Sequence, residues 1–349
     1  MTRSGRLHRR GHRSVVLSHA ELRQCLGRTV LLAVVCGALV WSRGLTVRAR
    51  GDRAFEDEDG VGPSLAQCAA MSNVLRYAAF TTDPSGGNPA GVVLDASTLD
   101  EPAMQALAAD LGYSETAFLT HVDDGVLEVR YFSPAAEVPF CGHATIATAV
   151  ALAERDGPGS SVFRTRSGDV AVDSDLDDVG LYATSTSVEP CVELVDEATV
   201  DEALGALDWA RSDLHLSMPP RVASAGARHL ILVAATRQRL AALDYDFERL
   251  RRLMLAEDWT TVHLAWPESV HLHHARNPFP VGGVVEDPAT GAAAAAYGAY
   301  LRDLGYLTAP ARLVIHQGDD LGRPSRLMVD VAAGDSRIRL SGHAVRITP

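Results

Sequence analysis

The sequence predicts an α/β protein made of two similar halves, each with one helix buried inside a sheet. In the first half, an apolar strand end runs through Gly142 into the small, apolar residues 146–152. In the second half, the polar turn at 287–291 leads into the equally small-sided residues 292–301. Helices with so little polar surface belong in a core. Because this turn-to-helix pattern occurs once in each half, we expect a duplicated domain with a site between the halves.

The first half is expected to have strands on both sides of its buried helix. A dense turn signal at 81–89 separates the first two strands. Met104, Leu107, Ala108 and Leu111 recur at the spacing of a helix face. We expect strands at 74–80, 90–94, 114–119 and 126–132, a helix at 101–111, the buried helix at about 143–154, and short strands at 162–165, 170–173 and 180–185.

The second half repeats this order of elements but not the residue identities. We expect a helix near 200–209, a strand at 228–234, helical sequence at 237–257, strands at 261–266 and 270–274, the buried helix at 291–304, and strands at 312–316, 326–331 and 337–347. We therefore place the halves at 71–188 and 189–349.

Residues 1–70 differ in character from the rest of the chain. They are rich in arginine, and their apolar run at 29–41 is too short for an ordinary membrane span. Three interpretations are an upstream extension from a misassigned start with Met71 as the true start, a signal or anchor segment, and a disordered leader. We expect the first, and we expect no membrane association for residues 71–349.

Composition excludes several classes of site. The 32 basic residues are all arginine, so no lysine is present for a Schiff base, a pyridoxal cofactor or a P-loop. Residues 71–349 hold 21 of these arginines against 38 acidic residues, which argues against a nucleic-acid partner. The five cysteines lack metal-binding spacing and indicate a reduced, cytoplasmic setting. We expect Cys191 to be structural.

Five motifs occur in a fixed order along the chain. They are GNPAGVV at 87–93, SETAF at 114–118, PFCGHAT at 139–145, EDPATG at 286–291, and QG at 317–318 with GRPS at 322–325. Together they resemble the PhzF family, which is named for the phenazine-biosynthesis isomerase, over residues 74 to about 347. The resemblance implies a diaminopimelate-epimerase-like fold, in which each half is a curved mixed sheet around a central helix. It also implies an active site in the cleft and a homodimer.

The resemblance further implies an isomerase that needs no metal, flavin or nicotinamide cofactor. In the phenazine enzyme, a glutamate moves a proton between carbons of 2,3-dihydro-3-hydroxyanthranilate, and the resulting enol becomes a ketone. The matching glutamate is Glu115, which we expect to be the general acid and base. His143 matches the family histidine, which orients the substrate or relays a proton. Asp287 matches the family aspartate, which either holds a substrate amino group or caps its turn.

The expected substrate is a small carboxylate-bearing molecule held at the two helix N-termini. Backbone amides at a helix N-terminus bind anions, and a glycine lets the ligand approach them closely. The expected substrate-binding residues are Asn88, Gly142, Ala144, Gly291 and Ala292. No metal site is expected.

Two departures from the family pattern leave other functions open. The phenazine enzyme has a serine where Ala292 stands, so the phenazine reaction itself is in doubt. Cys141 occupies the place of one of the two catalytic thiols of diaminopimelate epimerases, but the second motif offers no thiol, so we expect Cys141 to be a packed turn residue. The alternatives are an epimerase or racemase on the same fold and a catalytically silent binding protein.

The histidines at 271, 273 and 274 are a further candidate group. Histidines two residues apart lie on one face of a strand, as metal ligands would. Because no carboxylate or cysteine has a fitting spacing, we expect a solvated strand face instead.

Overall fold

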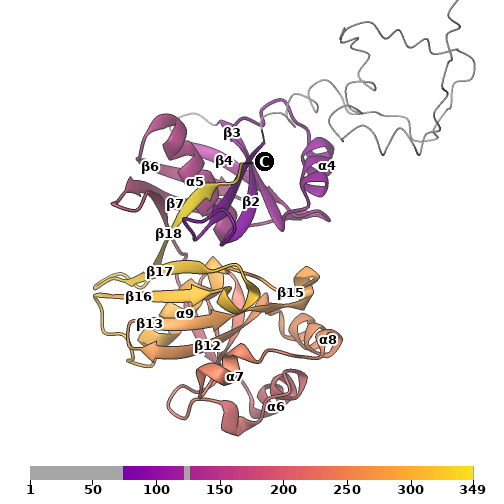
Figure 1. Cartoon of the computed structure of the whole chain (residues 1–349), viewed down its shortest axis with the longest axis vertical. Helices are drawn as coiled ribbons and strands as arrows, with labels where there is room; N and C mark the ends of the chain where they lie inside the picture. The colour runs from indigo at the N-terminus through magenta and orange to yellow at the C-terminus, as the bar shows by residue number, and fades with distance from the viewer. Residues whose placement is uncertain (1–73, 122–125, 349) are drawn as a thin grey trace, which may run out of the picture. The chain divides into compact units, whose positions relative to one another are not determined.

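The computed structural model describes residues 74–121 and 126–348, and the expectations for residues 1–70 lie outside the described part of the chain. The described residues form a mixed α/β fold, which confirms the predicted fold class (Figure 1). Within these ranges, no helix combines the length and the apolar character needed to cross a membrane.

The first half is a ring of strands around the buried helix α5 (Gly142–Asp156). The strands are β1 (Leu75–Ala79), β2 (Asn88–Val93), β3 (Glu115–His121), β4 (Val126–Phe132), β5 (Glu137–Val138), β6 (Ser160–Thr165), β7 (Gly168–Leu176) and β8 (Leu181–Thr186). The last strand of the chain, β18 (Ile338–Arg346), pairs with both β1 and β8 and closes the ring. Helix α4 (Glu101–Leu111) packs on Phe118 and Phe132, outside the core around α5.

The second half wraps its strands around the buried helix α9 (Gly291–Asp303). Its long sheet contains β9 (Cys191–Leu194), β10 (Arg221–Ser224), β11 (Arg228–Val233), β12 (Thr261–Ser269), β13 (Leu272–Arg276), β16 (Ala311–Gln317) and β17 (Ser325–Val331), and β14 (Pro278–Phe279) pairs with β15 (Val284–Glu286). Helices α6 (Glu197–Ala206), α7 (Arg237–Ala241) and α8 (Phe247–Glu257) contribute to a separate apolar cluster. Short 3-10 turns cover Arg211–Asp213, Pro280–Gly282 and Asp319–Leu321.

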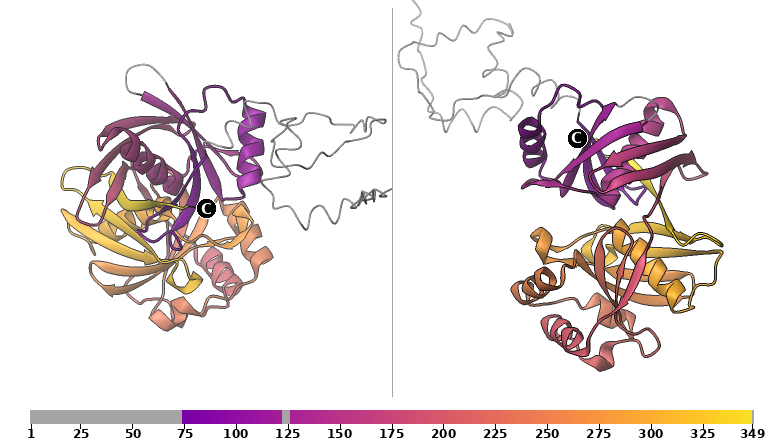
Figure 2. Two further views of the ribbon diagram at one scale, coloured as in Figure 1. Left: turned by 45° about the horizontal axis from the view of Figure 1, so that its top comes forward. Right: turned by 180° about the vertical axis from the view of Figure 1, so that it is seen from behind.

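Strand β18 joins the two halves into one sheet. It pairs with β8 of the first half on one edge and with β17 of the second half on the other (Figure 2, yellow). At the crossing, Ser341 is opposite both Thr184 and Met328, and the hydroxyls of Ser341 and Thr184 are 2.8 Å apart. Residues from the 189–349 segment therefore complete the sheet of the first half, and the boundary at 188/189 stays a prediction.

Most of the expected elements are present. The short strands β5, β14 and β15 were not expected, and two larger differences occur. The helical sequence at 237–257 is two helices, because the Asp246 side chain accepts a hydrogen bond from the Arg249 amide and starts α8 anew. Strands β9 and β10 were not expected. They pair with each other across a long connection, so their pairing is not visible in local periodicity.

Two glycines inside helices differ in what surrounds them. A Cβ added at Gly298, in the buried helix α9, would lie 2.5 Å from Val329 Cγ1 on β17. A Cβ added at Gly205, in α6, would lie 2.7 Å from Arg249 Nη2, which is the end of a long exposed side chain paired with Glu202. Val329 is fixed in the core, whereas the Arg249 side chain can move away from an added methyl group.

We predict that Gly298→Ala lowers the free energy of unfolding by about 1–3 kcal/mol, because the added methyl group overpacks the contact between α9 and β17. The matched change Gly205→Ala is expected to leave stability unchanged or raise it by up to about 1 kcal/mol, through helix propensity. Urea denaturation of the full chain measures both values. A Gly298→Ala chain as stable as the Gly205→Ala chain would contradict the packing described here.

Candidate active site

The two buried helices meet at their N-termini. A Cβ added at Gly142, the first residue of α5, would lie 3.6 Å from the Cα of Gly291 and 3.6 Å from the backbone nitrogen of Ala292. Gly291 is itself the first residue of α9. The structure therefore brings Gly142, Gly291 and Ala292 together, as the duplicated motif led us to expect.

Neither of these two N-termini has a side-chain cap among the described residues. Cys141 precedes α5 and Thr290 precedes α9, and neither side chain bonds to an amide of its helix. In contrast, α4, α6, α7 and α8 each begin with a side-chain cap, supplied by Asp100, Asp196, Thr236 and Asp246. The first-turn amides of α5 and α9 are therefore the ones left free for an anionic ligand.

Glu115 begins β3 and faces the N-terminus of α5. Its side chain is only 15% exposed, and its Oε2 lies 3.4 Å from His143 Nε2 and 3.5 Å from Cys141 Sγ. Burial raises the pKa of the Glu115 carboxyl, and hydrogen bonds from Ser114 and Cys141 partly offset that rise. The environment thus favours a carboxyl that exchanges its proton closer to neutral pH than an exposed glutamate does.

His143 lies between Glu115 and the second half of the chain. Its Nδ1 is 3.2 Å from the side-chain nitrogen of Asn88. Its Nε2 is 3.4 Å from the Glu115 carboxylate, which can only accept, so Nε2 carries the proton. That proton points towards Glu115 and the Ser114 hydroxyl, which is 3.3 Å away. Burial lowers the pKa of His143, although the charge of Asp287 opposes this effect. A neutral His143 therefore orients the Glu115 carboxylate.

Asn88 connects the two halves. It begins β2 and is 1% exposed, and its amide donates to Asp287 Oδ1 at 2.8 Å and to the Ala289 carbonyl at 3.0 Å. Because an amide group has two protons, these two bonds use its donor capacity and leave the His143 contact as the weaker one. Asn88, His143 and Asp287 thus form one buried polar group.

Asp287 stands in the turn that leads into α9. Burial raises its pKa to about 6, although the nearby His143 and the Thr290 and Asn88 hydrogen bonds lower it. The Thr290 hydroxyl donates to Asp287 Oδ2 at 2.6 Å. Just before it, Glu286 forms a buried ion pair with Arg276, which fixes the strand that delivers Asp287.

Two supporting residues received no role in the sequence analysis. Gln317, at the end of β16, donates to the Asp287 carbonyl at 2.8 Å and accepts from the Thr290 amide at 3.2 Å. Arg323 donates to the carbonyls of Gly86 at 2.6 Å and Gly87 at 2.8 Å, which holds the turn before Asn88. Gln317 belongs to the QG motif and Arg323 to the GRPS motif. Membership of these motifs was the sequence signal that could have identified both residues.

Cys141 is buried, as expected, but it belongs to the site. Its sulfur lies 3.3 Å from His143 Nδ1 and within reach of Glu115. Burial and the charge of Glu115 raise the pKa of the thiol, so the uncharged form prevails. Ala144 is the third residue of α5 and therefore lies at the same helix end. Cys191 is exposed on β9, and its structural role stays a prediction.

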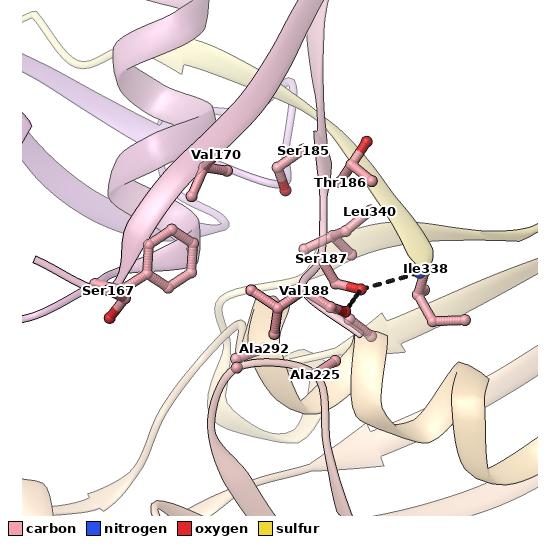
Figure 3. Close-up of a pocket in the computed structure, with 15 residues that line it drawn as sticks. Ser167, Val170, Ser185, Thr186, Ser187, Val188, Ala225, Ala292, Ile338 and Leu340 are labelled. Atoms are coloured by element: carbon pink, nitrogen blue, oxygen red, sulfur yellow. Dashed lines mark hydrogen bonds between the residues drawn. The ribbon is translucent and has the colours of Figure 1, made fainter. Parts of the chain in front are cut away.

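A pocket of about 60 Å³ lies beside the two turns. Gly142, Gly291 and Ala292 form the part of its wall at the helix ends, whereas Glu115, His143 and Asp287 do not line it. Figure 3 shows Ser187 in another wall, where it donates to the Val188 carbonyl and accepts from the Ile338 amide. The pocket thus reaches the free helix ends but not the buried carboxylates.

The histidines near 273 differ from the expectation. His273 is 1% exposed, and its Nδ1 forms a hydrogen bond with the Tyr297 hydroxyl of α9 at 2.8 Å. The prediction of a solvated face is therefore wrong for His273, because α9 supplies a polar partner that spacing along the strand does not reveal. His271 is exposed and lies on the turn before β13.

Comparisons with known proteins agree on a family. The family model described as phenazine biosynthesis-like protein, PhzC-PhzF, matches residues 77–348. An uncharacterized isomerase from Bacillus subtilis is 31% identical over 285 residues, which cover 78% of this chain and 96% of that protein. The crystal structure of a PhzF-family phenazine biosynthesis protein from Bacillus anthracis is 28% identical, with a TM-score of 0.71 and coverage of 79% and 96%.

A more distant structure extends the likeness of the fold. A probable proline racemase from Agrobacterium radiobacter has a TM-score of 0.56 at 11% identity, covering 78% of this chain and 90% of the racemase, and this likeness concerns the fold alone. It agrees with the epimerase-like architecture expected from the sequence. With the family model covering nearly all described residues, the chain belongs to the phenazine biosynthesis-like PhzC-PhzF family.

Proposed function

We propose that the chain is an isomerase that moves a proton between carbons of a small carboxylate-bearing metabolite. The observation that carries this proposal is the buried Glu115, held next to two helix N-termini whose first amides have no side-chain cap. The Bacillus subtilis relative is named an isomerase, which supports the reaction class. A carboxylate in such a position supports proton abstraction and return without a cofactor.

Each group has a distinct role in this proposal. The amides at Gly142, Ala144, Gly291 and Ala292 hold the substrate carboxylate, with Asn88 fixing the two turns. Glu115 removes a proton from one carbon and returns it to another. Neutral His143 keeps Glu115 oriented, and Asp287 holds a polar group of the substrate, such as an amino group.

The substrate is proposed to be small. The pocket of about 60 Å³ is well below the roughly 300–1,000 Å³ of typical ligand sites. We propose 2,3-dihydro-3-hydroxyanthranilate as the first candidate. Its binding requires the pocket walls to move so that the pocket also opens to Glu115, which does not line it in this structure. Ala292 supplies no hydroxyl to this ligand, so a related carboxylate is the next candidate. The homodimer and the cytoplasmic location stay predictions.

The alternative of a two-base racemase receives less support. Glu115 Oε2 and Cys141 Sγ are 3.5 Å apart and share a hydrogen bond. Two groups at that separation leave no space for a carbon atom between them, so they cannot serve opposite faces of one centre. The raised pKa of the Cys141 thiol also disfavours a thiolate base.

The first test uses the full chain in D₂O with 2,3-dihydro-3-hydroxyanthranilate, followed by NMR. We expect product with deuterium at one carbon, and Glu115→Gln is expected to lower the rate by about 10²–10⁴-fold, because it removes the acid and base. Glu128→Gln, an equal loss of charge at an exposed position on β4, serves as the control. Exchange without isomerisation but with inverted configuration would favour an epimerase. No exchange by the folded chain would exclude this substrate.

The second prediction concerns pH. Glu115 must be ionised to remove a proton, so kcat/KM falls as the pH drops through its pKa, which burial places above that of an ordinary glutamate. Cys141→Ala removes a hydrogen bond that stabilises the carboxylate and is expected to shift the acidic limb to higher pH. Cys141→Ser keeps a donor and is expected to shift it less. Identical profiles for the three proteins would contradict the contact between Cys141 and Glu115.

The third prediction separates a binding role for Asp287 from simple capping. Burial raises the pKa of Asp287 to about 6 in the folded chain, against about 4 in the unfolded chain. The buried Asp287 carboxylate therefore lowers the free energy of unfolding as the pH rises from 4 to 6, and the full cost of about 3 kcal/mol is present above pH 6. Asp287→Asn keeps the shape and is expected to stabilise the chain by about 1–3 kcal/mol at pH 7.5, with the difference vanishing near pH 4. Urea denaturation at both pH values measures this, and a destabilised variant at pH 7.5 would favour pure capping.

A further inference from the structure

A second cluster of ligating side chains lies on two neighbouring strands of the second half, away from Glu115. β13 and β16 pair in parallel, and His274 is directly opposite His316 (Figure 1). Asp319 opens the 3-10 turn that follows β16. One ligating atom from each of these three residues lies within 4.8 Å of the other two.

The contacts of His274 fix which of its nitrogens carries a proton. Its Nε2 is 2.7 Å from Glu268 Oε2, and a carboxylate can only accept there, so Nε2 is protonated. Its Nδ1 is buried and has no hydrogen-bond partner among the described residues. In neutral His274, the Nδ1 lone pair therefore faces the Asp319 carboxylate at 3.7 Å, where two acceptors repel each other.

A cation between these two groups would remove that repulsion. A histidine that binds a metal usually donates its other ring N–H to a carboxylate, which fixes the ring and raises its basicity. Glu268 stands in that position relative to His274. The His316 ring lies next to the His274 ring, with 5.6 Å between the two ring centroids.

We propose that His274, His316 and Asp319 bind a divalent transition-metal ion, with zinc as the reference case, and that Glu268 orients His274. Two imidazoles and one carboxylate suit zinc, and water would complete a tetrahedral shell. Ligands about 2.0–2.2 Å from zinc are about 3.3 Å apart in a tetrahedron, close to the 3.7 Å between His274 Nδ1 and Asp319. Rotation of the partly exposed side chains closes the remaining gap.

This site is separate from the proposed isomerase site. Residues alternate along β16, so His316 is on the partly exposed face and Gln317 is on the buried face that holds Asp287. No atom of the proposed substrate site belongs to the cluster. The competing explanation is a doubly protonated His274 paired with both carboxylates, and the experiment must distinguish the two.

The test is a zinc titration of the full chain, freed of metal with a chelator, in competition with a chromophoric chelator. The parent is a Cys141→Ala chain, because Glu115, Cys141 and His143 form a second group within 4.8 Å that could bind zinc. We expect one zinc ion with a Kd below about 10 μM. His316→Ala and Asp319→Asn are expected to weaken it at least tenfold, and Glu268→Gln by about 10–100-fold.

His271→Ala is the matched control. It removes a histidine three residues from His274 that bonds to the Arg312 carbonyl and is not part of the cluster, so the Kd should change less than twofold. Each variant differs from the parent at one position, so a change in Kd reports the contribution of that residue. Circular dichroism confirms that each variant is folded. The proposal would be overturned if the parent chain bound no zinc ion with a Kd below about 100 μM. It would also be overturned if the Kd were unchanged in both His316→Ala and Asp319→Asn. Either result would favour the ion-paired His274.

Discussion

The close approach of two uncapped helix N-termini is the constraint on which the rest of the structure depends. Amides that are neither capped nor solvated cost free energy unless a partner binds them. The other long helices of the described chain begin with an aspartate cap. Among these long helices, only α5 and α9 lack a side-chain cap at the N-terminus. Their small side chains, together with Gly142 and Gly291, allow the two ends to come within contact distance.

Burial at this junction also controls protonation. The same low polarity raises the pKa of the carboxyls of Glu115 and Asp287 and lowers the pKa of His143. These shifts bring carboxyl titration towards neutral pH, where proton transfer is most useful. The hydrogen bonds that hold the buried Asp287 come from Asn88 of the first half and Gln317 of the second half. The site is therefore assembled only when both halves are in place.

The sequence was sufficient for the features that depend on local pattern. The buried helices are visible in their small, mostly apolar side chains, and the motifs identified residues that the structure brings together, from Asn88 to Asp287. Features that depend on distant pairing were not predictable. The closure of the first ring by β18 requires contacts between residues far apart in sequence. The burial of His273 depends on the Tyr297 hydroxyl, which lies on another element.

Strand alternation explains how one pair of strands serves two sites. On β13, His273 points into the core while His274 lies on the opposite face, and on β16 the same holds for Gln317 and His316. His273 contacts Tyr297 of α9, and Gln317 contacts the turn that holds Asp287. A ligand that holds His316 in place would therefore also restrain its neighbour Gln317. A metal bound by His274 and His316 would link the middle of β13 to the end of β16. The same two strands would then carry a stabilising ion on one face and the support of the isomerase site on the other.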